Sequence, residues 1–208
     1  MWRMPRPLLA RSNATDPSDR ELVASALQGD TQAYGVLVSR YQLRIFRLAS
    51  HMVKNTSDAE DVTQETFVRA FRALERFDGR SEPFTWIYRI AVNLSLNVLR
   101  ARRVRRHATT DDDPRLEAEL VEKRPGYADP AGESSDREIF NNLSDAMNSL
   151  SDTLRTTLIL VCVDGLSNGD AAKVLGCPEG TVAWRVHEAR RKLRERLEAA
   201  GIDVEEES

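Results

Sequence analysis

Cysteines, metal-ligand motifs and long apolar runs are all scarce in this sequence. It contains two cysteines among 208 residues. Cys162 and Cys177 lie far apart and outside any paired metal-ligand spacing, so we expect no disulfide, no metal site and no cofactor. No apolar run is long enough to cross a bilayer, and the N-terminal apolar stretch is too short for a secretory signal. We therefore expect a cytoplasmic protein without membrane insertion.

Glycine and proline are also sparse, at 10 and 8 residues. They cluster between segments of helical periodicity, and no strand-like alternation interrupts those segments. The pattern predicts an all-α fold of two small helical domains joined by a flexible linker. We place a disordered N-terminal extension at 1–18, the first domain at 19–106, an acidic linker at 107–137, the second domain at 138–200 and an acidic tail at 201–208.

Histidine is scarce as well. Only His51, His107 and His187 are present, and none belongs to a recognisable catalytic group. No glycine-rich phosphate loop appears either, so the sequence argues against an enzyme. The net charge of −3 conceals strong local asymmetry. Arginines gather at 100–106 and 185–196, which points to nucleic acid as a partner.

The most informative segment is 164–197, which is typical of a helix, a tight turn and a second helix. Ala171 and Ala172 are small enough for two helices to approach closely. The expected boundary residues are Asn168 or Ser167 as the cap of the first helix, Gly176 as its end and Thr181 as the cap of the second.

The second helix of this segment has one apolar face and a basic remainder. The apolar positions are Val182, Val186, Ala189, Leu193 and Leu197. The other faces carry Ala183, Trp184, Arg185, His187, Glu188, Arg190, Arg191, Lys192 and Arg194. A helix of this kind fits the major groove of DNA. The alternative is a solvated, arginine-rich helix that only packs on its neighbour.

A second informative helix is expected over 84–106, with Pro83 in its first turn. Its inward face is Ile87, Ile90, Ala91, Leu94 and Val98. Trp86, Asn93, Asn97 and Arg100 line one flank, a combination that suits unstacked bases beside a duplex. The alternative is that Phe84, Trp86 and Tyr88 pack against the preceding helix, for which Ser57 and Glu60 form a capping-box pattern.

Two long motifs carry a resemblance to a known family. They are AEDVTQETFVRAFRALERFDGRSEPFTWIYRIAVNLSLNVLRARR at 59–103 and SLSDTLRTTLILVCVDGLSNGDAAKVLGCPEGTVAWRVHEARRKLRERL at 149–197. Together they resemble the extracytoplasmic-function (ECF) sigma factors, and the likeness covers most of 19–197. Two motifs in this order are more specific than a helix-turn-helix alone. The resemblance implies that the first domain is sigma region 2 and the second sigma region 4.

The resemblance also implies three sets of contact residues. Those expected to bind core RNA polymerase are Asp58, Glu60, Asp61, Gln64, Glu65 and Phe67. Those expected at the minus-10 element are Asp78, Gly79, Arg80, Ser81, Phe84, Trp86, Asn93, Asn97, Arg100 and Arg103. Those expected at the minus-35 element are Thr181, Ala183, Trp184, Arg185, His187, Glu188 and Arg191. The implied protein directs promoter-specific transcription initiation and performs no chemistry itself.

Two positions depart from the family pattern. Pro83 stands where an aromatic residue is usual, which alters how the preceding loop meets a base. Glu188 stands where many members carry a basic residue, and a carboxylate accepts a hydrogen bond from cytosine but repels phosphate. We therefore expect an unusual promoter preference.

The implied partners are bacterial core RNA polymerase, promoter DNA and an anti-sigma factor. The acidic linker is expected either to mimic nucleic-acid phosphates or to act as a simple tether. The alternative function is a stand-alone helix-turn-helix regulator, which would bind a palindromic operator without polymerase. The linker composition permits both compact and extended arrangements of the two domains.

Overall fold

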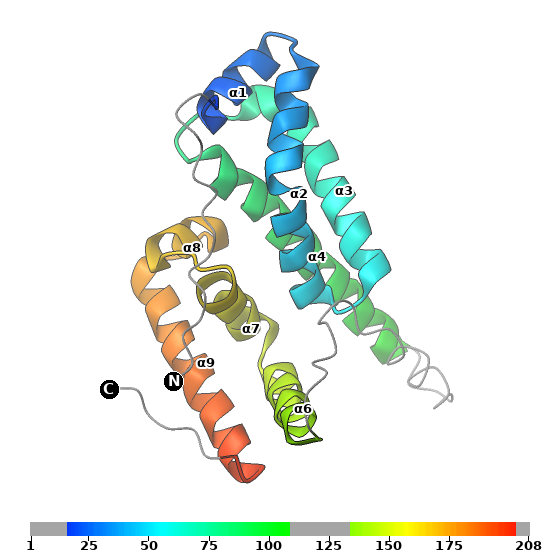
Figure 1. Ribbon diagram of the computed structural model, residues 1–208, viewed down its shortest axis with the longest axis vertical. Helices are drawn as coiled ribbons and strands as arrows, with labels where there is room; N and C mark the ends of the chain where they lie inside the picture. The colour runs from blue at the N-terminus through cyan, green and yellow to red at the C-terminus, as the bar shows by residue number, and fades with distance from the viewer. Residues whose placement is uncertain (1–15, 109–133, 203–208) are drawn as a thin grey trace.

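A computed structural model describes residues 16–108 and 134–202, and every regular element in these ranges is helical (Figure 1). The first part contains α1 (Asp19–Leu27), α2 (Thr31–Val53), α3 (Thr56–Arg72), the short 3₁₀ helix η1 (Leu74–Arg76) and α4 (Pro83–Ala108). The second contains α6 (Ser134–Ser149), α7 (Asp152–Leu158), the π-helical turn η2 (Ile159–Val163), α8 (Asn168–Leu175) and α9 (Glu179–Ala199). The predicted all-α fold is confirmed.

The helices at the predicted linker are longer than expected. α4 continues to Ala108 and α6 already begins at Ser134, so both enter the range that we had assigned to the linker. The central part of that range, 109–133, lies outside the described residues. The same is true of residues 1–15 of the predicted extension and 203–208 of the acidic tail.

Two predicted helix starts are wrong, one by two residues and the other by three. Asn55, not Ser57, caps α3, because its side chain accepts a hydrogen bond from the backbone N–H of Asp58. Thr181 does not cap α9, which begins at Glu179 with Pro178 in the cap position. Pro178 holds an extended conformation and so starts the helix without a side-chain cap.

The remaining predicted boundaries are confirmed. α4 begins at Pro83. Ser167, one of the two candidates, caps α8 by accepting from the N–H of Asp170 at 3.0 Å. Gly176 ends α8 in the left-handed conformation at φ 65°, which glycine adopts without a steric penalty.

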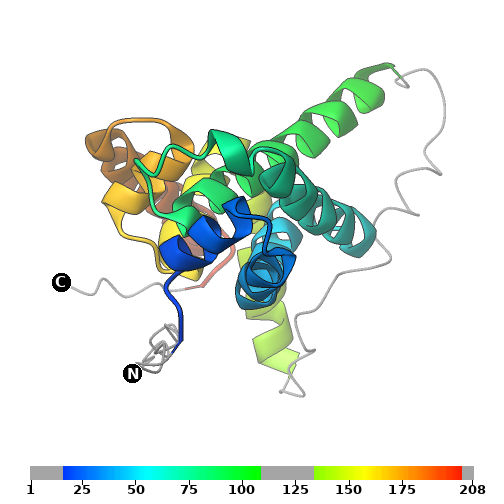
Figure 2. The same cartoon turned by 90° about the horizontal axis from the view of Figure 1, so that it is seen from above.

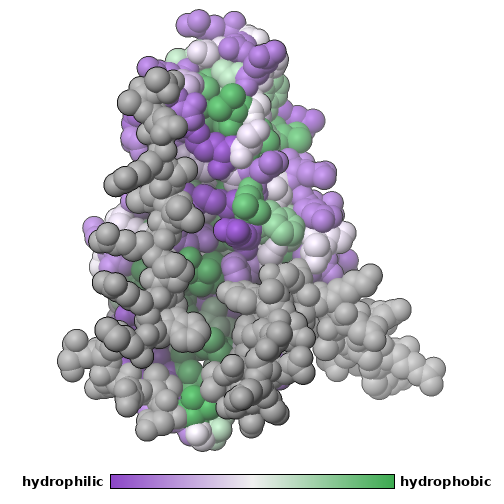
Figure 3. All heavy atoms as spheres, viewed as in Figure 1, coloured by the Kyte–Doolittle hydropathy of each residue, from purple (hydrophilic) through white to green (hydrophobic). Residues whose placement is uncertain are grey.

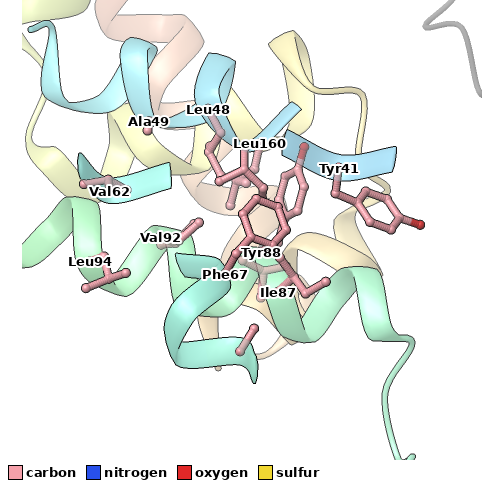
Figure 4. Packing of buried hydrophobic residues seen from close by; sticks show 14 of the residues in the cluster. Tyr41, Leu48, Ala49, Val62, Phe67, Ile87, Tyr88, Val92, Leu94 and Leu160 are labelled. Carbon is pink, nitrogen blue, oxygen red and sulfur yellow. The ribbon is translucent and has the colours of Figure 1, made fainter. Parts of the chain in front are cut away.

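The first domain is a bundle in which α2, α3 and α4 pack on one another and α1 crosses their end (Figure 1). Its core includes Leu48 and Ile45 of α2, Val62 of α3, and Ile87 and Tyr88 of α4, all nearly inaccessible to solvent (Figure 4). Burying a side chain of this size stabilises a fold by about 1.5 to 3 kcal/mol. The apolar periodicity of α4 therefore predicted its inward face correctly.

In the second domain, α8 and α9 form the helix-turn-helix. Ala171 and Ala172 are buried and allow α8 to approach its neighbours closely. α9 also packs on α6 and α7. A smaller apolar cluster of Leu150, Leu154, Leu158 and Ala189 joins these helices.

The two domains pack together, a point that the linker composition had left open. α8 lies against α4, and η2 lies against α2. Ile159 and Leu160 of η2 belong to the same apolar cluster as Leu48 and Tyr88 (Figure 4). Viewed from above, the yellow-to-red helices of the second domain lie along one side of the first (Figure 2). The two domains, each of which carries one candidate DNA-binding helix, thus share one continuous apolar core.

Candidate nucleic-acid interface

The polar flank of α4 is exposed along most of its length. Asn93, Asn97 and Arg100 all face solvent, and the Arg100 guanidinium donates to the Asn97 side-chain oxygen at 2.9 Å. Asparagine amides both donate and accept hydrogen bonds, so this row matches the edges of unpaired bases. The contacts within the row hold Asn97 and Arg100 in one geometry.

The loop before α4 is shaped by its own backbone. Asp78 accepts from the N–H of Arg80 at 3.0 Å, and Gly79 takes φ 69°. This Asx turn leaves the Arg80 side chain 88% exposed, while Ser81 is half-buried. The loop therefore presents a cation to any DNA that lies along α4.

The sequence left two interpretations for the aromatic residues at the start of α4, which are contact with unstacked bases and packing within the protein. Phe84 packs on the rings of Tyr41 and Tyr88, with centroid distances of 5.4 and 4.2 Å, and the Arg44 guanidinium lies 4.6 Å from its centroid. Phe84 thus follows the packing interpretation. Trp86 packs on Phe77 with the ring centroids 5.1 Å apart and the ring planes tilted by 46°, and it stays partly exposed.

The arginines near the end of α4 are partly engaged within the protein. Arg103 pairs with Asp152 of α7 at 2.8 Å. Arg102 donates to the Val53 carbonyl and pairs with Asp58, and so joins α4 to the turn between α2 and α3. Of the two predicted minus-10 arginines on α4, Arg103 is thus engaged with the second domain, whereas Arg100 bonds to Asn97 of the same helix.

The predicted polymerase-binding face of α3 is mostly exposed. Glu60, Asp61 and Gln64 face solvent, and Glu65 pairs with Arg69 at 2.6 Å. Phe67 differs from these residues because it is only 7% exposed and lies in the core. Its ring supports the surface from beneath, so we remove it from the set of direct contacts.

The predicted minus-35 residues of α9 differ in how far their side chains are exposed to solvent. Trp184 is 62% exposed, and Ala183 and His187 also face solvent. Thr181 and Arg185 are half-buried, with an Arg185 nitrogen 3.7 Å from the sulfur of Cys177, which is a free thiol like Cys162. The first two turns of α9 therefore offer an aromatic side chain, a methyl group and an imidazole to a groove.

Glu188 lies at the centre of an ion-pair network along α9. Arg191 donates to both of its carboxylate oxygens, at 2.9 and 2.8 Å, and also pairs with Glu195. Lys192 lies 3.8 Å from the same carboxylate. The hydrogen bond from Arg191 lowers the pKa of Glu188, so this side chain is ionised at neutral pH. The network holds the basic side chains in place along the outer face of the helix.

Two residues of this region were missed by the sequence interpretation. Arg89 lies on the exposed flank of α4, one turn before Asn93, and donates to the Lys173 carbonyl of α8. Helical spacing alone could have placed it on the flank. Asp164, at the end of η2, is half-buried next to Tyr88 and Arg44 of the first domain. No local pattern indicates such a position.

The described residues show no sign of a metal site or a membrane span. On the face shown in Figure 3, the residues over the first-domain helices are mainly hydrophilic. Within 16–108 and 134–202, no group of three or more His, Cys, Asp or Glu residues could hold a metal ion. In the same ranges, no helix is both long and apolar enough to span a membrane.

Comparisons with known proteins agree with this geometry. Residues 37–105 match the family model of sigma-70 region 2, and residues 140–193 match that of sigma-70 region 4. An ECF RNA polymerase sigma-E factor of Haemophilus influenzae is 35% identical over 184 residues, which are 87% of this chain and 96% of that protein. The chain belongs to the ECF RNA polymerase sigma factors.

Two solved structures share its architecture. CnrH in complex with the cytosolic domain of CnrY is 28% identical, with a TM-score of 0.63 over 88% of this chain and 99% of that one. The sigma factor RpoE of Bartonella quintana, in complex with the anti-sigma factor NepR, is 24% identical, with a TM-score of 0.57 over 81% and 97%. As an ECF sigma factor, this chain is a non-enzymatic subunit that directs promoter recognition by RNA polymerase. Family membership excludes the stand-alone regulator.

Proposed function

We propose that the exposed flank of α4 captures the minus-10 element and that the first two turns of α9 read the minus-35 element. The observation that carries this assignment is the row of Asn93, Asn97 and Arg100 beside the half-exposed Trp86. Amides that face an aromatic platform and a cation suit an unpaired base with its phosphate. On α9, exposed Trp184 offers apolar contact to thymine methyl groups.

The two helices are expected to contribute differently to recognition. Capturing an unstacked base requires a pocket that compensates for lost stacking, so Asn97 and Trp86 should affect melting. Reading a duplex in the major groove requires only an exposed helix with fixed phosphate contacts, such as Arg191 held by Glu188. The proposal thus separates a melting role for α4 from a docking role for α9.

The acidic face of α3 is the proposed site for core RNA polymerase. Glu60, Asp61 and Gln64 are exposed on one side of the helix, and their negative charge is complementary to a basic partner surface. Asp58 is included only in part, because its carboxylate is also paired with Arg102. We propose that the protein binds RNA polymerase in the cytoplasm, where bacterial transcription takes place.

An anti-sigma factor is the proposed regulator. The two structural relatives were each solved with a bound protein, the cytosolic domain of CnrY and the anti-sigma factor NepR respectively. A partner for this chain is expected to contact both domains, because both of them present exposed recognition surfaces.

In vitro transcription with purified bacterial core RNA polymerase and a promoter library tests the assignments. Promoter-specific transcripts should require this chain and should reveal both elements. Asn97→Ala and Trp184→Ala should each reduce those transcripts by about tenfold, the loss expected for one base contact. Gln42→Ala and Leu43→Ala, at exposed positions of α2, serve as matched controls and should leave transcription unchanged.

The transcripts also identify which element each helix reads. Asn97→Ala should act through the minus-10 positions and on melted templates, whereas Trp184→Ala should act through the minus-35 positions alone. Equal loss at both elements for either variant would contradict the assignment. Core binding by Glu60→Lys, measured by co-elution with the polymerase, tests the α3 surface.

A further inference from the structure

We infer that a cavity between the two domains binds a small phosphate-bearing anion of the size of a nucleotide. The cavity has a volume of about 370 Å³ and is lined by the end of α2, the last turns of α4, and the segment from the end of α6 into α7. Pockets for small ligands usually have volumes of about 300 to 1,000 Å³. The inference goes beyond the proposed contacts with DNA and polymerase and does not depend on them.

The lining of the cavity carries more positive than negative charge. Its cations are Lys54, which follows α2, Arg102 and Arg103 of α4, and Arg155 of α7. Asp152 is the one carboxylate among the described lining residues, and it pairs with Arg103 at 2.8 Å and with Arg155 at 3.0 Å. Two guanidiniums therefore share one carboxylate, and exposed Lys54 adds its charge at the edge of the cavity. A phosphate group would balance this surplus.

Arg102 contributes less to the surplus than the other cations do. Its guanidinium pairs with Asp58, which is not part of the lining, and donates to the Val53 carbonyl. These bonds fix Arg102 on the wall between α2 and α4. We therefore assign the recognition of phosphate mainly to Arg103, Arg155 and Lys54.

Arg155 is a buried cation with few hydrogen bonds among the described residues. It is 8% exposed, and Asp152 accepts the one hydrogen bond that its side chain makes within those residues. Burial lowers the pKa of the Arg155 guanidinium, Asp152 partly opposes this, and the like charge of Arg103 lowers the pKa further. A guanidinium has five N–H donors, so an anion beside this pair would supply acceptors and would relieve the repulsion.

The rest of the lining suits the organic part of such a ligand. Met52, Leu99 and Leu150 offer apolar contact, while Asn148 and Ser151 offer an amide and a hydroxyl. Apolar walls with a few polar groups are typical of sites for small organic molecules. A nucleotide would use both kinds of group, whereas pyrophosphate would use the cations alone, so we expect the nucleotide to bind more tightly.

A ligand in this cavity would contact both domains. Lys54 and Arg103 belong to the first domain, and Arg155 and Asn148 belong to the second. A molecule that binds only when both sides of the site are in place stabilises the packed arrangement by mass action. The ligand should therefore raise the temperature of thermal unfolding.

The experiment uses the full-length protein and two probes, ADP and sodium pyrophosphate, without divalent cations. Sodium sulfate at matched ionic strength serves as the reference anion. Isothermal titration calorimetry measures affinity. Acetylation of lysines by acetic anhydride, quantified by mass spectrometry, locates the site, because Lys54 lines the cavity whereas exposed Lys173 and Lys192 lie outside it.

Three variants accompany the wild type. Lys54→Gln removes the charge at the edge of the cavity, and Arg155→Met removes the buried guanidinium but keeps an unbranched side chain. Arg76→Gln also removes one charge, at an exposed position of η1 outside the lining, and is the matched control. Circular dichroism establishes that each variant is folded, and Lys54→Gln with the acetylation pattern suffices if Arg155→Met misfolds.

We expect ADP to bind the wild type with a Kd below about 1 mM and to bind more tightly than sulfate. ADP should slow acetylation of Lys54 by about threefold or more and leave Lys173 and Lys192 unaffected. Arg155→Met should weaken binding by about tenfold or more, and Lys54→Gln by about threefold to tenfold. Arg76→Gln should bind as the wild type does. Equal affinity for ADP and pyrophosphate would support the site and restrict recognition to the phosphate groups.

Two results would overturn the inference. Absence of binding by both probes up to about 1 mM would mean that the cavity is not an anion site. Binding that is unchanged in Lys54→Gln and Arg155→Met, or that protects Lys173 and Lys192 as well as Lys54, would place the anion on another basic surface. Neither result bears on the minus-10 assignment, which fails separately if Asn97→Ala leaves transcription unchanged.

Discussion

α4 and α9 are both assigned to promoter DNA, yet they differ in how the rest of the molecule supports them. α4 packs against α2, α3 and α8, and several of its polar residues bond to other elements, as Arg102 does to Asp58. α9 packs along one face only, and its charged residues bond mainly to one another, as Arg191 does to Glu188. The surface proposed to capture a flipped base is thus built on a well-packed core, whereas the helix proposed to enter a groove is packed along a single face.

The first prediction tests this difference in support by truncating one leucine in the packing of each helix. Leu48 of α2 is fully buried in the core on which α4 packs, while Leu193 is a half-buried residue of α9 itself. Leu48→Ala should lower the free energy of unfolding by about 2 to 5 kcal/mol because it leaves a cavity. Leu193→Ala should cost clearly less, since its site is already in contact with water. Urea unfolding followed by circular dichroism measures both, and equal losses would remove the distinction between the helices.

The second prediction concerns Glu188, which has no counterpart on α4. Glu188→Arg removes the acceptor that organises Arg191 and Lys192 and adds a donor suited to guanine. Base preference at one minus-35 position should change by about 5-fold to 150-fold in a promoter-library selection. Glu195→Arg, which also disrupts a pair with Arg191 but lies about two turns beyond Glu188, serves as the control. An unaltered preference would show that Glu188 does not influence base reading.

The third prediction compares two glycines at the turn of the helix-turn-helix. Gly176 takes φ 65°, whereas Gly180 lies inside α9, and a Cβ at either position would meet no atom within 4 Å. Gly176→Ala should destabilise the second domain by about 1 kcal/mol through backbone strain. Gly180→Ala should stabilise it by up to about 1 kcal/mol, because alanine is the better helix former. Thermal unfolding of the two variants should therefore shift in opposite directions, and a common direction would contradict this account of the turn.

The same contrast explains what the sequence could and could not predict. Apolar spacing placed Ile87, Ala91 and Leu94 on the inner face of α4, because periodicity reports the side on which a residue lies. It could not identify the partner that a residue meets there. The pairing of Arg103 with Asp152 depends on how two distant segments dock, and nothing local to either segment encodes it.

The two misplaced helix starts have a local cause. Asn55, Thr56 and Ser57 are all good capping residues, and the capping-box pattern favoured the wrong one. Asn55 takes the position because its backbone is extended, at φ −145° and ψ 129°, and its side chain reaches the N–H of Asp58. At α9 the fixed backbone of Pro178 made a side-chain cap unnecessary. Residue type alone does not distinguish such neighbours.

The smallest expected effect is the pH dependence of the packing between the two domains. It tests whether the second domain separates reversibly from α2 and α4. The docked state raises the pKa of Asp164 to about 7 by burial, while an open state returns it towards its ordinary value near 4. The docked state therefore binds more protons, and docking strengthens as pH falls through 7. Between pH 8 and pH 6.5 the ratio of docked to open molecules should rise about fourfold.

His51 sets the lower limit of that window. Burial, with a smaller contribution from Arg47, lowers the pKa of His51 from its ordinary value and so favours the neutral imidazole. With Cys162 and Cys177 replaced by serine, spin labels are attached to cysteines introduced at the exposed positions Gln42 of α2 and Arg196 of α9. The wild-type distance distribution should sharpen as the pH falls, and that of Asp164→Asn should not respond. A matching response in both would assign the titration to a group other than Asp164.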